Sequence, residues 1–178
     1  MCGSVAITNK NTKESNQDMN IDDINNMAVI GAGNMGHQIA MLCAIHGYKT
    51  VCTDINTEIL NKAENFADTY LAGRVKKGRL TEEQAKAARE RISFTSRMAE
   101  AVKDADYVIE AVLEILDLKR KIFADLDKMA PAHAILASNS SAIISSKIAD
   151  ATNRPEKVLN VHFFNPALVM KLVEVVQG

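Results

Sequence analysis

The stretch Met27-Ala28-Val29-Ile30-Gly31-Ala32-Gly33-Asn34-Met35-Gly36 decides how this chain is expected to fold. Residues 27–30 are apolar and predict a buried strand, and the run from Met35 to His46 repeats apolar residues at helical spacing. Between the two stands the pattern G-x-G-x-x-G. Gly31 permits a tight turn, Gly33 lets the backbone come close to a pyrophosphate, and Gly36 lets the helix pack against the strand. The stretch therefore predicts a strand, a turn and a helix whose N-terminus can accept an anion.

A carboxylate follows at the spacing expected of a dinucleotide site. Lys49–Thr53 predict a second strand that ends at Asp54, 18 residues after Gly36. There a carboxylate can accept hydrogen bonds from the hydroxyls of an adenosine ribose, and it would repel a 2′-phosphate. We therefore predict NAD rather than NADP as the cofactor, although a tightly packed glycine turn with Asp54 as a helix cap is the alternative. The predicted cofactor residues here are Gly31, Ala32, Gly33, Asn34, Met35, Gly36 and Asp54.

Short apolar runs alternate with helical stretches along the rest of the chain. Further strands are predicted at 92–94, 107–111, 134–138, 158–162 and 172–176. Helices are predicted from about Thr57 into the 74–79 region, from a cap at Thr81 onward, over 116–129 and near 144–149. Strands separated by helices imply a parallel sheet that is covered on both faces. The expected fold is a doubly wound, Rossmann-type α/β sheet with an inserted helical hairpin.

Length and composition suit one globular domain. The 178 residues include 21 Lys and Arg against 22 Asp and Glu, which gives a net charge of −1 and no general reason to bind nucleic acid. No apolar run approaches the roughly 20 residues that cross a membrane. The three cysteines, Cys2, Cys43 and Cys52, are odd in number and have no paired spacing, which argues against a disulfide scaffold and favours a reducing, cytoplasmic location. No Cys-x-x-Cys or matching pair of His residues is present, so we expect no zinc or other metal site.

The first 26 residues are unlike the rest. They carry six Asn, no Arg and no sustained apolar period, so they match neither a secretory signal nor a mitochondrial transit peptide. We expect residues 1–26 to be a flexible polar tail and residues 27–178 to be one dinucleotide-binding domain.

Three polar side chains stand where catalysis is expected. Ser141 and His162 follow or end predicted strands, on the edge of the sheet that also carries the glycine loop. Glu174 approaches His162 if the segment between them turns the chain back. A neutral imidazole can take the proton of an alcohol while a hydride leaves its carbon, and a carboxylate can orient that imidazole. A structural histidine and an edge-strand carboxylate are the alternatives.

These segments together resemble the NAD-binding domain of the 3-hydroxyacyl-CoA dehydrogenases, and among them the 3-hydroxybutyryl-CoA type. The resemblance extends from about Met27 to Gly178. It implies reversible hydride transfer between a 3-hydroxyacyl-CoA and a 3-oxoacyl-CoA, as in fatty-acid or butyrate-type metabolism. Besides the glycine loop, its most specific pieces are Val108-Ile109-Glu110-Ala111, Ala137-Ser138-Asn139-Ser140-Ser141, and His162-Phe163-Phe164-Asn165-Pro166 through Met170-Lys171-Leu172-Val173-Glu174-Val175.

The resemblance also implies roles for single residues. His162 would be the general base, Glu174 its orienting partner, and Ser141 a contact to both the substrate oxygen and the nicotinamide. Glu114, Lys119 and Asn165 would line the nicotinamide-ribose half of the cofactor site. The helical hairpin would hold coenzyme A, with Lys77 as the best single contact. Residues 71–97 hold eight Lys and Arg against three Glu, which suits a phosphate-rich ligand, although a solvated basic face is the alternative.

The chain departs from the family pattern in several places. Ser140 stands where Thr is usual, Ala142 where Ser is usual, and Leu168 where a proline is common. The family continues into an all-helical domain that closes over the substrate, supplies a catalytic Asn and carries most of the dimer contact. We expect the 178 residues to contain none of that domain, and we therefore expect weak or no activity from them alone and a homo-oligomer only where that domain is present. Two alternatives are a non-catalytic NAD-binding module that acts with a partner chain and a related hydroxyacid or sugar-acid dehydrogenase.

Overall fold

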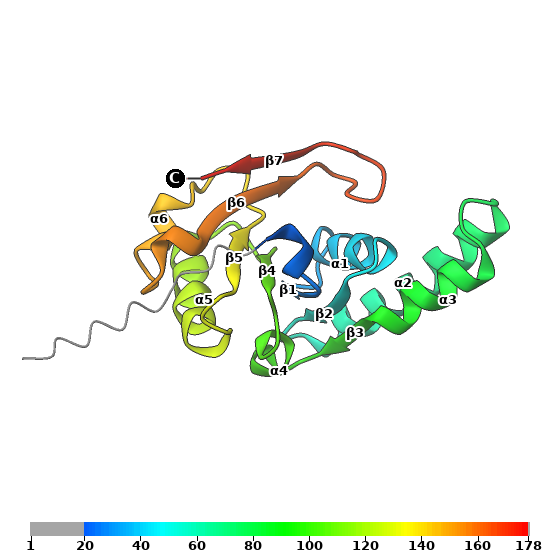
Figure 1. Cartoon of the computed structure of the whole chain (residues 1–178), viewed down its shortest axis with the longest axis horizontal. Coiled ribbons are helices and arrows are strands. Elements are labelled where there is room, and N and C mark those ends of the chain that lie inside the picture. The colour runs from blue at the N-terminus through cyan, green and yellow to red at the C-terminus, as the bar shows by residue number, and fades with distance from the viewer. Residues whose placement is uncertain (1–19, 178) are drawn as a thin grey trace, which may run out of the picture.

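The computed structural model describes residues 20–177, and it shows a seven-stranded sheet with helices on both faces (Figure 1). The strand order is β3-β2-β1-β4-β5-β6-β7. The predicted Rossmann-type α/β class is confirmed. The strands are β1 (Asn26–Ile30), β2 (Lys49–Thr53), β3 (Ile92–Thr95), β4 (Tyr107–Glu110), β5 (Ile135–Ser138), β6 (Val158–Phe163) and β7 (Val173–Val176); the helices are α1 (Gly36–Ile45), α2 (Thr57–Lys76), α3 (Glu82–Arg91), α4 (Met98–Val102), α5 (Leu116–Met129) and α6 (Ser146–Ala149), with short 3₁₀ turns at Ile21–Asp23 and Pro155–Lys157.

The chain reverses its direction of winding between β1 and β4. From β1 it proceeds outward through β2 to β3, and it then returns to place β4 on the other side of β1. The first six strands are parallel, so their carboxyl ends share one edge of the sheet. In a doubly wound sheet, ligands bind in the crevice outside these ends, at the point of reversal. The glycine loop follows β1 and therefore lies at that crevice.

The last strand departs from the expected parallel sheet. β7 pairs with β6 in antiparallel register, and His162 lies opposite Glu174. Only residues 164–172 join the two strands, whereas a parallel crossover needs a dozen residues or more. The short connection therefore forces a hairpin, and the hairpin brings these two side chains together.

One buried layer lies on each face of the sheet. Ala28 and Val29 are both fully buried, but successive strand residues point to opposite faces, so each belongs to a different core cluster. Val29 packs with α1, α2 and α3 side chains such as Ile39, whereas Ala28 packs with α5 side chains such as Phe123. Burial on both faces explains why β1 reads as a continuous apolar run.

The helical hairpin α2–α3 extends away from the sheet, at the right of Figure 1. The side chain of Asn56 caps α2 by accepting from the amide of Glu58. Thr81 caps α3 as predicted, since its hydroxyl accepts from the Gln84 amide while the Gln84 side chain accepts from the Thr81 amide. Helix α4, which is only five residues long, was not predicted from the sequence.

The described end of the predicted tail belongs to the domain. Asn26 is already the first residue of β1, one residue before the predicted boundary. Asp106 accepts the backbone amides of Asn25 at 2.9 Å and of Asn26 at 2.8 Å, which ties the start of β1 to the start of β4. The first 19 residues of the predicted tail lie outside the described residues. Within residues 20–177, no helix is long and apolar enough to cross a membrane.

Candidate cofactor and catalytic site

Two glycines of the loop are required by the space around them. Gly31 has a φ of +96°, which side chains rarely adopt, and a Cβ there would lie 2.8 Å from the carbonyl oxygen of Ala111. A Cβ on Gly36 would lie 1.7 Å from the carbonyl oxygen of Gly31. Both glycines therefore allow α1 to begin directly against β1 and β4.

Gly33 differs, because a Cβ on it would meet nothing within 4 Å. The open space lies at the N-terminus of α1. In the described part of the chain, the amides of Asn34 and Met35 have no hydrogen-bond partner. Open space beside free amides and a helix N-terminus suits a pyrophosphate. The residues present therefore fit the phosphate portion of a dinucleotide.

Asp54 lies beside this loop. Its Oδ2 atom accepts the Ala32 amide at 2.9 Å, and its Oδ1 atom accepts the Asn56 amide at 2.9 Å. The cap of α2 is Asn56, so Asp54 is not the helix cap that the alternative interpretation required. Each carboxylate oxygen retains acceptor capacity for a ribose hydroxyl.

A buried ion pair underlies the crevice between β4 and α5. Lys119 Nζ lies 2.8 and 3.0 Å from the two carboxylate oxygens of Glu110, and both side chains are almost wholly inaccessible. Glu110 also accepts from the Ser138 hydroxyl at 2.7 Å and from the Val112 amide at 2.7 Å. No role was predicted for Glu110 from the sequence. Its signal was a charged residue inside the apolar run Val108-Ile109-Glu110-Ala111.

Lys119 also reaches Glu114, at 3.3 Å, so two of the predicted cofactor residues are in contact. Burial by itself would raise the pKa of Glu114, but the Ser140 hydroxyl, Lys119 and the Ala142 amide together hold it below its ordinary value. Ser140 also accepts the Ile143 amide at 2.8 Å. Lys119 is thus committed to two carboxylates, and it holds Glu114 in its ionised form at the edge of the crevice.

The three predicted catalytic residues share one hollow between the loop after β5 and the β6–β7 hairpin. Ser141, His162 and Glu174 all line it. The Nδ1 atom of His162 lies 3.7 Å from a carboxylate oxygen of Glu174, which is within ion-pair range but longer than a hydrogen bond. His162 is partly buried, whereas Glu174 is mostly exposed. Ser140, Ala142, Ile143, Ile144, Asn160 and Val176 complete the lining.

The loop after β5 supports His162. The side-chain oxygen of Asn139 accepts the backbone amide of Phe163 at 2.8 Å, and the ring of His162 lies 4.9 Å from that of Phe164. Asn165, which the resemblance assigns to the cofactor site, is exposed and makes no polar contact with another described side chain. Its assignment stays a prediction.

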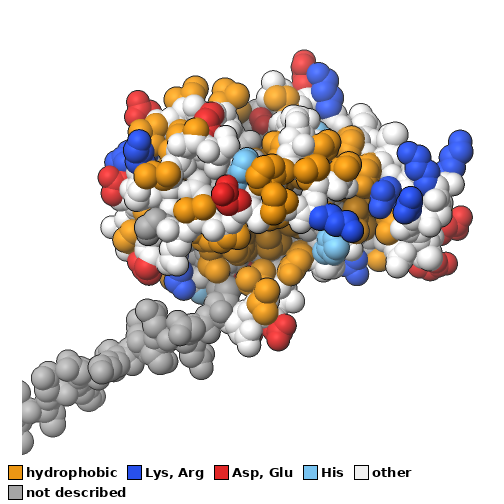
Figure 2. All heavy atoms as spheres, turned by 90° about the horizontal axis from the view of Figure 1, so that it is seen from above, with side chains coloured by type: hydrophobic (Ala, Val, Ile, Leu, Met, Phe, Trp, Pro, Cys, Tyr) orange, Lys and Arg blue, Asp and Glu red, His pale blue; other side chains and the backbone are white. Residues whose placement is uncertain are grey.

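The tip of the α2–α3 hairpin carries positive charge without counter-charge. Lys77 is the C-cap residue directly after α2, and no acidic side chain in residues 20–177 forms an ion pair with Lys77 or with its neighbours Arg74, Lys76 and Arg79. Further along, Arg89 pairs with Asp68 and Glu64. The basic side chains toward the right of Figure 2 lie at the end of the molecule where the hairpin extends.

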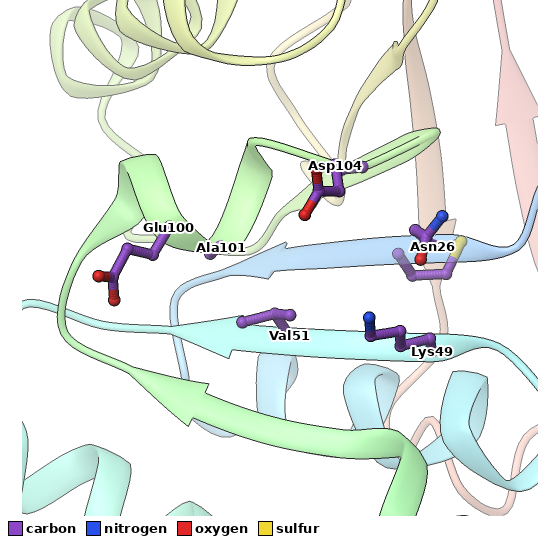
Figure 3. Close-up of a pocket in the computed structure, with 8 residues that line it drawn as sticks. Asn26, Lys49, Val51, Glu100, Ala101 and Asp104 are labelled. Carbon is purple, nitrogen blue, oxygen red and sulfur yellow. The ribbon is translucent and has the colours of Figure 1, made fainter.

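A second hollow lies at the opposite edge of the sheet. Asn26 and Lys49 stand at the amino ends of β1 and β2 and line it together with Glu100, Ala101 and Asp104 (Figure 3). Because the glycine loop, Ser141 and His162 lie at the carboxyl edge, this hollow is separate from the candidate site. Residues 20–177 contain no group of His, Cys, Asp and Glu side chains that could hold a metal ion.

Comparison with known proteins assigns the chain to a family. Residues 26–178 match the family described as 3-hydroxyacyl-CoA dehydrogenase, NAD binding domain. The chain belongs to this family. The identification confirms the resemblance and NAD as the cofactor of the domain.

Individual relatives agree with the assignment. The chain is 41% identical over 156 residues to a probable 3-hydroxybutyryl-CoA dehydrogenase of Bacillus subtilis, covering 88% of this chain and 54% of that protein. It is 39% identical over 154 residues to a glyoxysomal fatty acid beta-oxidation multifunctional protein of Brassica napus, covering 86% of this chain and 21% of that protein. The crystal structure of an (S)-3-hydroxybutyryl-CoA dehydrogenase from Ralstonia eutropha superposes with a TM-score of 0.83 at 37% identity, covering 87% of this chain and 54% of that one.

These matches cover most of this chain but only part of each relative. The chain spans about half the length of the 3-hydroxybutyryl-CoA dehydrogenases and about a fifth of the multifunctional protein. What this 3-hydroxyacyl-CoA dehydrogenase family member shares with them is therefore the NAD-binding domain.

Proposed function

We propose that this domain takes part in NAD-dependent interconversion of 3-hydroxyacyl-CoA and 3-oxoacyl-CoA, with His162 as the general acid and base. The observation that carries the proposal is the hollow that Ser141, His162 and Glu174 share, on the same edge of the sheet as the glycine loop. A binding module needs no imidazole and carboxylate in such an arrangement. The bound NAD supplies the hydride acceptor in oxidation, and NADH supplies the donor in reduction.

The side chains divide the proton chemistry among them. In alcohol oxidation, the Nε2 atom of His162 takes the hydroxyl proton of the substrate, and Glu174 on the Nδ1 side stabilises the imidazolium that forms. The Ser141 hydroxyl holds the substrate oxygen by a hydrogen bond. In reduction, His162 returns the proton to the same oxygen. A small rotation closes the 3.7 Å separation between His162 and Glu174 to hydrogen-bond length.

The cofactor and coenzyme A occupy separate parts of the domain in this proposal. NAD would be held by the glycine loop, its adenosine ribose by Asp54, and its nicotinamide ribose by the group of Glu114, Lys119 and Asn165. The loop residues are Gly31, Ala32, Gly33, Asn34, Met35 and Gly36. The coenzyme A phosphates lie at the uncompensated basic tip of the hairpin, with Lys77 as a direct contact. Acyl-CoA is therefore the proposed small-molecule partner. Buried thiols at Cys43 and Cys52 suit a reducing compartment such as the cytoplasm.

Catalysis in this proposal needs a helical domain packed on the β7 side. Figure 2 shows hydrophobic side chains gathered across the face on which β7 lies in Figure 1. All four residues of β7 are exposed, and apolar residues exposed on this hairpin or near it include Ile144, Val169, Met170, Leu172, Val173, Val175 and Val176. A patch of this kind is typical of an interface. A helical domain there would complete the wall of the hollow and carry the contacts of a homo-oligomer.

The test is NADH oxidation in the presence of acetoacetyl-CoA, with a helical domain of a relative supplied in cis or in trans. Turnover is expected with that domain and little or none without it. Replacing His162 by Ala is expected to lower kcat by about a hundredfold or more, since general acid–base catalysis contributes that much, while NADH affinity stays close to that of the parent. His46→Ala, at the exposed C-terminal end of α1, is the matched control. Folded, NADH-binding protein without any turnover under these conditions would favour the non-catalytic NAD-binding module instead.

A further inference from the structure

The two residues that follow the glycine loop bind its carbonyl groups. His37 and Gln38 are the second and third residues of α1. The Nδ1 atom of His37 lies 2.6 Å from the carbonyl oxygen of Gly33, and the Nε2 atom of Gln38 donates to the carbonyl oxygen of Asn34 at 2.9 Å. A carbonyl oxygen only accepts, so Nδ1 of His37 carries the proton. Each side chain thus holds the carbonyl group four residues before it.

Holding a carbonyl group also fixes the amide in the same peptide. In a trans peptide the C=O of one residue and the N–H of the next point in opposite directions. His37 therefore turns the Asn34 amide away from itself, and Gln38 does the same to the Met35 amide. These are two amides that lack a hydrogen-bond partner among residues 20–177, and they flank the open space at Gly33.

Neither side chain is free to rotate. The His37 ring packs edge-to-face on Phe66 of α2, with ring centroids 4.5 Å apart and an interplanar angle of 69°. Gln38 is 8% exposed, and its Nε2 atom also lies 3.3 Å from the side-chain oxygen of Asn34. Packing therefore holds both donors in the orientation that the loop carbonyls require.

We propose that His37 and Gln38 are positioning residues for the pyrophosphate of NAD. They hold the Gly33–Asn34 and Asn34–Met35 peptides so that both amides face the dinucleotide before it binds. Donors that are already oriented bind an anion without the free-energy cost of ordering a loop. The inference rests on the proposed placement of NAD at the glycine loop, but not on any turnover.

The test compares ligands with and without phosphate. NADH affinity is measured by fluorescence titration, and adenosine affinity is measured by its competition with NADH. His37→Phe keeps a ring on Phe66 but removes the donor, and Gln38→Met keeps the length but removes the donor. Each is expected to weaken NADH binding roughly tenfold and to leave adenosine binding nearly unchanged, as the loss of one well-made hydrogen bond would. His46→Phe, the same substitution at the far end of α1, is expected to match the parent.

Two further measurements separate positioning from general structure. His37→Gln is expected to recover most of the NADH affinity, because Gln38 shows that a glutamine on this helix reaches the carbonyl four residues back. Nitrogen NMR of the His37 ring is expected to show the Nδ1–H tautomer. NADH binding at parental strength in His37→Phe and Gln38→Met would overturn the inference, as would an equal loss of adenosine binding. A parent that binds NADH but shows no turnover even when the helical domain is supplied would contradict only the proposed function.

Discussion

Gly33 and Gly36 are three residues apart in the glycine loop, but their substitution has different consequences. The Gly36 α-carbon faces the Gly31 carbonyl oxygen, and a Cβ would lie 1.7 Å from it. The Gly33 α-carbon faces open space. Gly36 is therefore required by the packing of the fold, whereas Gly33 leaves space for a ligand.

A pair of alanine variants tests this difference. Gly36→Ala is expected to destabilise the domain by about 3 kcal/mol or more, since backbone must move to relieve the overlap. Gly33→Ala is expected to melt within a few degrees of the parent but to lose most NADH affinity, because the new methyl group stands where the pyrophosphate approaches. Thermal melting and NADH titration of both variants measure the two effects. Equal losses of stability in the two variants would contradict the assignment of roles.

The buried pair Glu110–Lys119 gives a second prediction at the scale of single residues. Lys119→Met leaves the Glu110 carboxylate buried without its cation, and we expect a loss of about 3–5 kcal/mol in the free energy of unfolding. The double variant Glu110→Gln with Lys119→Met removes both charges and is expected to lose less than the single variant. Urea unfolding of the three proteins measures the difference. A single variant as stable as the double variant would show that the pair is not coupled.

The α2–α3 hairpin is the element that carries the coenzyme A proposal. Its tip holds Arg74, Lys76, Lys77 and Arg79 without acidic partners in the described structure, whereas Lys86 on α3 lies 4.0 Å from Glu90. In the described structure, the basic residues at the tip of the hairpin therefore have no ion-pair partner, whereas Lys86 on α3 has one. A phosphate ligand would bind the tip.

Lys77→Ala tests the hairpin. With the helical domain supplied, we expect a several-fold higher KM for acetoacetyl-CoA, roughly threefold to tenfold, with kcat and NADH affinity unchanged, because a charge-assisted contact to phosphate is lost. The effect is expected to shrink as salt is added, since exposed charges are screened. Lys86→Ala is the matched control on the same hairpin. The prediction fails if both variants raise KM equally.

At the scale of the whole molecule, carboxylates join segments that are far apart in the sequence. Asp106 binds the start of β1, Glu114 binds the loop after β5, and Asp127 binds Arg154 and Asn153 before β6. Burial by itself would raise the pKa of each, but these partners hold all three pKa values below the ordinary range. The three links therefore stabilise the folded state when these carboxyl groups are ionised.

Stability is expected to depend on pH in consequence. A carboxyl group whose pKa is lower in the folded state adds stability above its unfolded pKa, and that stability is lost as the pH falls through the folded pKa. We expect a level urea midpoint from pH 8 to about 6 and a decline below about pH 4, close to the ordinary pKa of Asp and Glu. Asp127→Asn is expected to be less stable than the parent at pH 7, and the two should converge at low pH. A constant difference between the two proteins across the whole range would contradict the assignment to Asp127.

Much of the fold could be predicted from local patterns. The bounds of β2 and α5 are those expected; β1, β4, β5 and β6 differ from expectation by one residue at one end, and α1 differs by one residue at each end. These elements have strong signals, because apolar periodicity and glycine, proline or capping residues mark their ends. The short helix α4 lacked such a signal, and so did the turn at residues 21–23.

The sequence by itself determined the family, the doubly wound sheet, the glycine loop and the identity of the polar residues at the carboxyl edge, since these depend on local spacing and residue type. Only the tertiary structure decided which of those residues meet. The antiparallel register of β7 brings Glu174 to His162, the packing of α5 buries Lys119 against Glu110, and the ring of Phe66 orients His37. The physical reason is that each of these contacts joins side chains on different elements, and their distance is set by how the elements pack rather than by their spacing along the chain.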